Sequence, residues 1–148
     1  MEQGLKEKDL TSRIIRAAIA VHRHLGPGFL EAIYEEAMCI ELDDTGIAYE
    51  RQRAIPLTYR GRPIGEHRLD LLVGGRVVVE LKAIAALDKI HFAVVRSYMK
   101  AVGCEVGLLL NFATMPLTVK RVGRETHEPI PDFLISKLNP EESGRRGI

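Results

Sequence analysis

The chain has few of the residues that mark several common protein classes. It contains no tryptophan and only two cysteines among 148 residues, and aromatic residues make up 5%. Cys39 and Cys104 do not form a metal-ligand spacing, and each lies in a mostly apolar stretch, which predicts buried, reduced thiols. No window approaches the roughly 20 apolar residues of a membrane helix, and the N-terminus has no apolar signal segment. These absences exclude a disulfide scaffold and favour a cytoplasmic protein without a membrane partner.

The chain also has almost no net charge, with 21 Lys and Arg against 20 Asp and Glu. This balance neither predicts nor excludes a nucleic-acid partner. The distribution says more, because residues 29–50 contain seven acids and no Lys or Arg, whereas residues 51–68 contain five arginines and one acid. The two segments could form opposite sides of one charged cleft, or two ordinary solvated surfaces.

The length, the hydrophobic fraction of 46% and the charged fraction of 28% are ordinary for one globular domain. Apolar periodicity and turn residues predict helices at 11–25, 30–45 and 88–102, and strands at 47–59, 64–73, 77–83, 105–112 and 117–122. This order predicts an α/β (α+β) fold with a mixed sheet flanked by helices, in which the third and fourth strands are parallel because a helix connects them.

Two finer expectations follow from the same patterns. Helix 30–45 is expected to face the core with Leu30, Ile33, Ala37 and Ile40, which recur at helical spacing. The chain is expected to form a frayed N-terminus at 1–9, a single domain at 10–124, and a partly mobile C-terminal extension at 125–148.

A predicted hairpin carries the most informative charges of the sequence. Two apolar runs meet at Gly74-Gly75, which is typical of a β-hairpin. A loop of three residues, Gly74 to Arg76, gathers six apolar residues on one buried face, whereas a two-residue loop would mix the faces. The six residues are Leu69, Leu71, Val73, Val77, Val79 and Leu81. Asp70 then lies opposite Glu80, with Cβ atoms roughly 5 Å apart, and Lys82 shares the face of Glu80.

Charges retained inside apolar strands need partners, because burying one alone costs several kcal/mol. Asp70, Glu80 and Lys82 together would suit a hard divalent cation and an activated water. The alternative is a solvated ion pair, which is the common meaning of Glu-x-Lys on an exposed strand.

The element order, with an acid on the second strand and Glu-x-Lys on the third, resembles the PD-(D/E)XK nuclease superfamily. The run Gly28-Phe29-Leu30-Glu31-Ala32-Ile33-Tyr34 resembles the motif of the GxxExxY protein family, a branch of that superfamily. Residues 18–28, 80–83 and 106–112, together with His91 and Tyr98, also fit this family in order. The resemblance covers roughly residues 10–122 and implies a restriction-endonuclease-like core.

The resemblance also implies roles for individual residues. Asp70, Glu80 and the backbone carbonyl of Leu81 would bind Mg²⁺ or Mn²⁺, and Glu31 would complete the site from its helix. Lys82 would orient the attacking water or help to deprotonate it. A carboxylate-held metal suits phosphodiester hydrolysis, since it activates water and neutralises charge on the phosphate. We therefore take Asp70, Glu80, Lys82 and Glu31 as the candidate catalytic set.

Several neighbouring residues have two interpretations. Tyr34 could hold Glu31 by a hydrogen bond or pack in the core, and Tyr98 could contact phosphate or pack between elements. His91 is a further auxiliary candidate. Arg51, Arg53, Arg60 and Arg62 could follow a phosphate backbone, or be ordinary exposed arginines.

Two functions are consistent with the sequence. The first is a metal-dependent nuclease acting on nucleic acid, with DNA favoured over RNA; the intact acids and lysine support it. The second is a non-cleaving module of the nuclease fold that binds nucleic acid or a protein. It is supported by the neutral net charge and by Val94, which stands where related families often carry Gln. Assembly into a homo-oligomer is left open.

Overall fold

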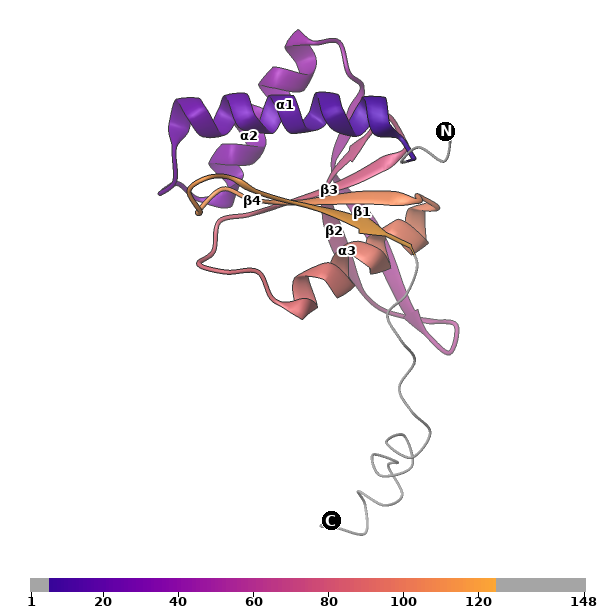
Figure 1. Cartoon of the computed structure of the whole chain (residues 1–148). Helices are drawn as coiled ribbons and strands as arrows, with labels where there is room; N and C mark the ends of the chain where they lie inside the picture. Colours follow the sequence, from indigo (N-terminus) through magenta and orange to yellow (C-terminus); the bar gives the residue numbers. More distant parts are fainter. Residues whose placement is uncertain (1–5, 125–148) are drawn as a thin grey trace, which may run out of the picture.

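A computed structural model describes residues 6–124, and the predictions for residues 1–5 and 125–148 lie outside this range (Figure 1). The described chain forms three helices and a five-stranded sheet of order β1-β2-β3-β4-β5. The helices are α1 (Lys8–Leu25), α2 (Glu31–Asp44) and α3 (Lys89–Val102). The strands are β1 (Tyr49–Tyr59), β2 (Arg62–Val73), β3 (Val77–Lys82), β4 (Val106–Asn111) and β5 (Thr118–Gly123).

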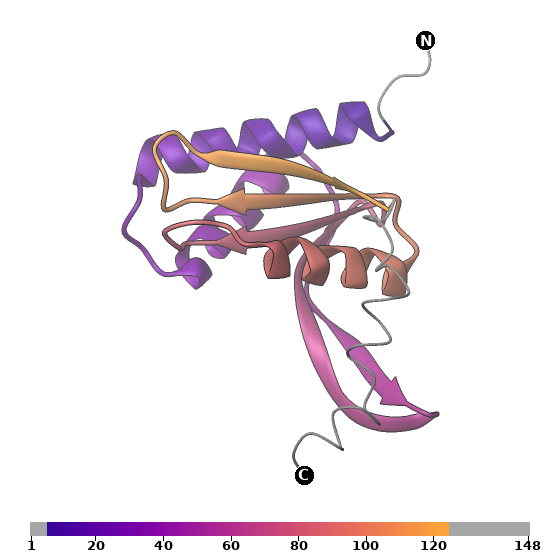
Figure 2. The ribbon, with the colours of Figure 1, turned by 60° about the horizontal axis from the view of Figure 1, so that its bottom comes forward.

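The sheet lies between two helical layers, with α1 and α2 on one face and α3 on the other (Figures 1 and 2). β3 and β4 are parallel, as predicted from the crossover helix between them, and the other neighbouring strands are antiparallel. The predicted mixed sheet flanked by helices is therefore confirmed. None of the helices in residues 6–124 is long and apolar enough to cross a membrane.

Each face of the sheet buries its own apolar cluster. On the α1 and α2 side, Leu71, Val79 and Leu108 pack beneath helix residues that include Ile14 and Met38. On the α3 side, Leu72, Val78 and Leu109 pack against Val95 and Met99. α3 lies very close to β4, because a Cβ on Gly107 would come within 2.7 Å of a Val95 methyl carbon. Both faces are therefore dry over β3, β4 and the adjoining end of β2, and a charge there is unusual.

The inward face of α2 differs from the prediction, although Ala37 packs against the core cluster as predicted. Leu30, Ile33 and Ile40 are 78%, 46% and 53% exposed, while Tyr34 and Met38 are completely buried. Two apolar stripes run along this helix one residue apart. Because both stripes have helical periodicity, the sequence pattern does not show which of them faces the sheet. The stripe that contains the large aromatic side chain of Tyr34 packs against it.

The loop between β2 and β3 is the predicted three-residue connection. Val73 pairs with Val77, and the backbone N–H of Arg76 donates to the Val73 carbonyl at 3.0 Å. Gly74 and Gly75 have φ of +60° and +69°, a left-handed conformation that favours glycine. One member of the predicted apolar face is wrong, because Leu69 packs in the cluster on the α3 side. Strands β1 and β2 are distorted next to Leu69. Gln52 of β1 has φ of +50°, and Gln52 and Asp70 are not paired with each other, although the residues on either side of them are.

Candidate active site

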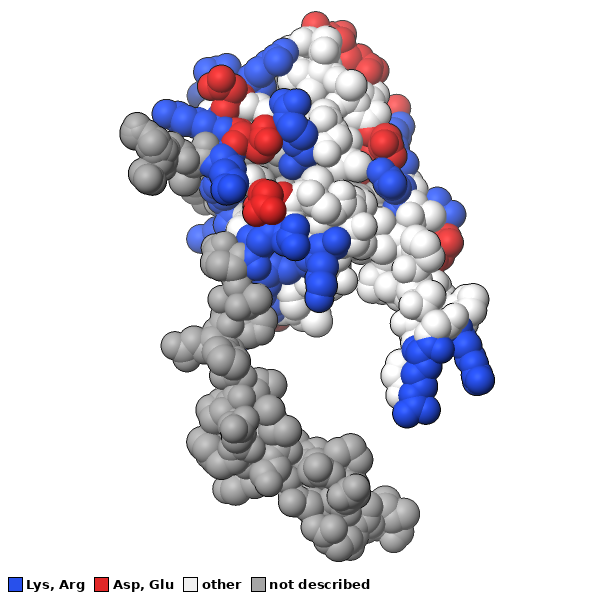
Figure 3. Space-filling view, turned by 90° about the vertical axis from the view of Figure 1, so that its right-hand side faces the viewer, with Lys and Arg blue, Asp and Glu red and all other residues white. Residues whose placement is uncertain are grey.

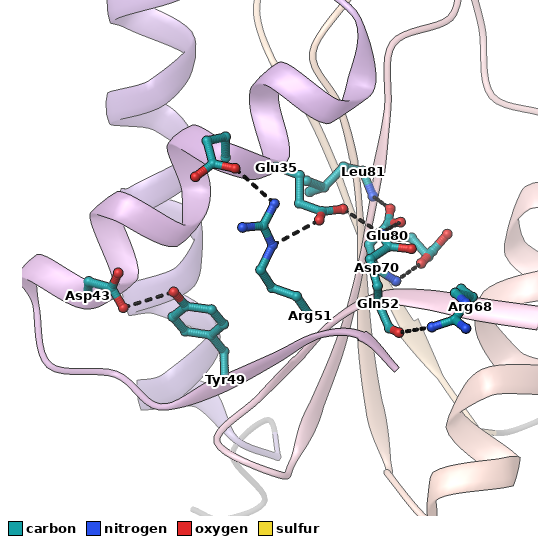
Figure 4. Close-up of polar contacts among 10 residues, drawn as sticks. Glu35, Asp43, Tyr49, Arg51, Gln52, Arg68, Asp70, Glu80 and Leu81 are labelled. Carbon is teal, nitrogen blue, oxygen red and sulfur yellow. Dashed lines mark hydrogen bonds and ion pairs between the residues drawn. The ribbon is translucent and has the colours of Figure 1, made fainter. Parts of the chain in front are cut away.

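Asp70 and Glu80 lie together at the point where β2 leaves β3. The backbone N–H of Asp70 donates to Glu80 Oε1 at 2.8 Å, and that of Leu81 donates to Asp70 Oδ2 at 2.9 Å (Figure 4). Each carboxylate thus accepts a hydrogen bond from the backbone of the neighbouring strand. The two acids that were predicted to face each other are therefore held close together by backbone hydrogen bonds between β2 and β3.

Both carboxylates are poorly solvated. Glu80 is 5% exposed, and burial, followed by the charge of Asp70, raises the pKa of Glu80 to about 8. Burial likewise raises the pKa of Asp70, although the hydrogen bond from Leu81 opposes this. The positive charge of Lys82 lowers the pKa of Glu80 but does not outweigh these effects. Two acids in this state need a proton or a cation between them at neutral pH.

Gln52 and Glu35 extend the carboxylate pair towards α2. The Gln52 side-chain amide donates to Glu35 Oε1 at 2.7 Å and to Asp70 Oδ1 at 3.2 Å. Glu35 is 7% exposed, and its other oxygen accepts from Arg51 Nε at 3.1 Å. The amide of Gln52 therefore links Glu35 to Asp70 and fixes the side chain of Asp70.

Sequence reasoning missed both of these residues. Glu35 follows Glu31 by four positions, so both lie on one face of α2, and this spacing was a usable signal. Gln52 had no such signal, because its contacts depend on a left-handed backbone inside a strand.

Glu31 lies at the start of α2 and reaches the end of β3. Its Oε2 accepts from the backbone N–H of Ala83 at 3.4 Å, and Ala83 directly follows Lys82. The negative charge of Glu31 raises the pKa of both Asp70 and Glu80. Glu31 thus contributes charge to the region of the pair, and its part as a metal ligand stays a prediction.

Tyr34 does not hold Glu31 by a hydrogen bond. Its hydroxyl donates to the Gly26 carbonyl at 2.6 Å and accepts from the Phe29 N–H at 3.2 Å. Its ring stacks on Phe112 with centroids 4.5 Å apart. Tyr34 therefore fixes the turn before α2, and so acts on the position of Glu31 through the backbone.

Tyr34→Phe is expected to lower the free energy of unfolding by about 1–3 kcal/mol, because it removes two hydrogen bonds to part-buried backbone groups, each worth about 0.5–1.5 kcal/mol. Urea unfolding would measure this change. Tyr59→Phe is the matched control, since Tyr59 is 63% exposed and its loss of a hydroxyl should cost little. Equal stability of Tyr34→Phe and wild type would contradict the anchoring role.

The auxiliary candidates separate into two groups. His91 makes no hydrogen bond to the carboxylates within residues 6–124; its Nδ1 accepts from the backbone N–H of Asp88 at 2.8 Å and so caps α3. Tyr98 lies closer, since burial and then the charges of Glu80 and Asp70 raise its pKa to about 12. Its hydroxyl donates to the Arg68 carbonyl at 3.3 Å. Val94 is partly buried against the apolar cluster beneath α3.

The four arginine candidates also differ from one another. Arg51 is bonded to Glu35 and Glu36, so the acidic helix and the basic strand do meet. Arg53 pairs with Glu50 at 3.4 Å. Arg60 and Arg62 instead lie at the turn between β1 and β2, the outer end of the hairpin. Only the last two are placed to meet a large ligand away from the acids.

The donor set fits a hard divalent cation. Within residues 6–124 no three His, Cys, Asp or Glu side chains already form a cluster able to hold a metal ion. The fit rests instead on the half-buried Asp70 and the buried Glu80, which lie together. The charge of Glu31 acts on both acids, and that of Glu35 acts on Asp70. Carboxylate oxygens are ligands that Mg²⁺ and Mn²⁺ prefer.

Comparison with known proteins agrees with this arrangement. A family model described as the PD-(D/E)XK nuclease superfamily matches residues 8–122. No curated protein matches the chain. A solved crystal structure, that of SSO0001, is similar to the chain at 16% sequence identity with a TM-score of 0.48, and the match covers 78% of this chain and 58% of that one. The chain thus spans less than two thirds of SSO0001. From the match over most of its length, the chain belongs to the PD-(D/E)XK nuclease superfamily.

Proposed function

We propose that this protein is a metal-dependent nuclease of the GxxExxY branch, which hydrolyses phosphodiester bonds of nucleic acid. The observation that carries the proposal is the pair of the half-buried Asp70 and the buried Glu80, which accept hydrogen bonds across β2 and β3. A structural role alone does not explain why two acids share one largely buried site, since neutral side chains would fill it at lower cost. A cation bound between them removes the repulsion.

Different residues of the chain would bind the metal, orient the attacking water and position the metal ligands. Asp70, Glu80, the Leu81 carbonyl and Glu31 would hold Mg²⁺ or Mn²⁺, which when bound supplies an activated water and neutralises charge on the phosphate. The ammonium group of Lys82 would orient the attacking water and, through its positive charge, favour release of the water's proton to solvent. Gln52 and Glu35 would keep the Asp70 carboxylate in place, because the Gln52 amide bonds both acids.

Lys82→Met is expected to lower the rate of Mg²⁺-dependent cleavage by about 10²–10⁴-fold. The substitution removes the positive charge that orients the attacking water and favours loss of its proton. Cleavage of plasmid DNA and of a long RNA would be followed by gel electrophoresis. Lys100→Met is the matched control, since Lys100 is an exposed lysine in the last turn of α3. Full activity of Lys82→Met would remove Lys82 from the mechanism.

The same assay tests the non-cleaving alternative, which the apolar side chain of Val94 favours. If wild-type protein cleaves neither DNA nor RNA with Mg²⁺ or Mn²⁺, the binding module becomes the better description. If it cleaves and the control variant keeps the wild-type rate, the nuclease proposal stands.

A further inference from the structure

The hairpin of β1 and β2 extends well beyond the body of the domain. We call residues 53–68 of this hairpin the arm. Figure 2 shows it leaving the sheet and projecting past α3. All of Arg62–Arg68 are exposed, and seven strand residues span about 23 Å. Ile55, near the base, is the one residue of the arm that belongs to a core cluster. The rest of the ribbon is not needed to cover the core, and its surface is free to meet a partner outside the domain.

The free end of the arm is positively charged. Figure 3 shows Lys or Arg side chains at this end, which stands apart from the body. They are Arg60 and Arg62, the only cations between Ala54 and His67. The one acid of the arm, Glu66, pairs with Arg68 at 3.0 Å, nearer the base. The two end arginines therefore have no acidic partner among residues 6–124, and they are available to an anionic ligand.

Two large apolar residues accompany these arginines. Tyr59 and Ile64 are 63% and 65% exposed. The Arg60 guanidinium lies over the Tyr59 ring, 5.7 Å from its centroid, which limits the positions it can occupy. The end of the arm thus offers cations with apolar contact area beside them.

The base of the arm is fixed relative to the carboxylate pair. His67 meets the ring of Tyr98 edge to face at 5.8 Å, and the Tyr98 hydroxyl donates to the Arg68 carbonyl at 3.3 Å. Asp70 follows two residues later on the same strand. A ligand held by the arm is therefore held at a defined distance from the acids. α3 adds further cations, since Lys89 and Arg96 line a shallow hollow on its surface with Phe92 and Ala93.

We propose that the arm enters the major groove of double-stranded DNA, with Arg60 and Arg62 on the phosphates that border it. The major groove of B-form DNA is about 12 Å wide and admits a two-stranded β-ribbon. The major groove of an RNA duplex is too deep and narrow for protein side chains to read, which favours DNA. Tyr59 and Ile64 supply the kind of apolar contact that thymine methyl groups accept. This inference rests on the proposed function and deepens it by naming the substrate.

The test measures binding alone, in EDTA and without metal, by fluorescence anisotropy. The ligands are a labelled 30-base-pair DNA duplex, the RNA duplex of the same sequence, and the DNA single strand. Wild type is expected to prefer the DNA duplex. Arg60→Ala with Arg62→Ala should weaken binding to it by about tenfold or more at 0.1 M salt, and should lower the salt slope by about 2, the value for two lost phosphate contacts.

Arg16→Ala with Arg23→Ala is the matched control, because it removes two exposed cations from α1 on the opposite side of the sheet. An equal loss in this control, or equal wild-type affinity for all three ligands, would overturn the inference. So would a change in oligomeric state of the arm variant, seen by sedimentation, together with unchanged DNA binding. Failure of cleavage leaves this result intact, since a protein that binds through the arm but never cleaves contradicts only the proposed function.

Discussion

Glu80→Gln is expected to stabilise the metal-free protein at pH 8.5 by a few kcal/mol and to change its stability little at pH 4.5. In the folded protein burial and the charge of Asp70 raise the pKa of Glu80 to about 8, from an ordinary value of 4.5. Between these two values the unfolded chain releases the proton and the folded chain retains it. The free energy of unfolding therefore falls as pH rises through this window, by up to about 1.4 kcal/mol for each pH unit. A neutral amide of the same shape removes this loss.

Urea unfolding in EDTA at the two pH values would measure the effect. Glu105→Gln is the control, because Glu105 is an exposed acid directly before β4 and is 3.6 Å from Arg124. Its stability should follow that of wild type at both pH values. If Glu80→Gln and wild type lose the same stability between pH 4.5 and pH 8.5, Glu80 does not carry a raised pKa.

Asp70→Asn and Glu80→Gln are each expected to weaken Mg²⁺ or Mn²⁺ binding by at least 10–100-fold, the usual cost of losing even an outer partner of a metal ligand. A second measurement is the effect of the metal on stability. Mg²⁺ or Mn²⁺ should raise the free energy of unfolding of wild type at pH 8.5, since an ion that binds only the folded state stabilises it. Neither variant should gain comparable stability at the same metal concentration. The two results together distinguish a metal site from a pair of acids that simply shares a proton.

The carboxylate pair was predictable because several constraints on the hairpin agree. The alternate apolar residues Leu71, Val73, Val77, Val79 and Leu81 share a face only if the loop contains three residues, and the structure has this loop. This register brings Asp70 and Glu80 together just beyond the end of the pairing of β2 with β3, whose last pair is Leu71 with Val79. The parallel pairing of β3 and β4 follows in the same way from the helix between them.

The remaining features depend on tertiary contacts that no local pattern records. α2 has two apolar stripes, and packing against the sheet selected the one with Tyr34 rather than the one with Ile33. Leu69 lies on the α3 side because the strands are distorted at Gln52, and a glutamine gives no sign of a left-handed backbone. The link from Glu35 to Asp70 through Gln52 depends on the same distortion.

The central claim is that Asp70 and Glu80 bind a divalent metal, and isothermal titration calorimetry with Mn²⁺ tests it most directly. Wild type, Glu105→Gln, and the double variant Asp70→Ala with Glu80→Ala would be titrated at pH 8 after treatment with EDTA and dialysis. Circular dichroism would first establish that the double variant is folded. We predict saturable binding by wild type and by Glu105→Gln, and none by the double variant. Equal binding by the folded double variant and wild type, or no binding by wild type, would contradict the account.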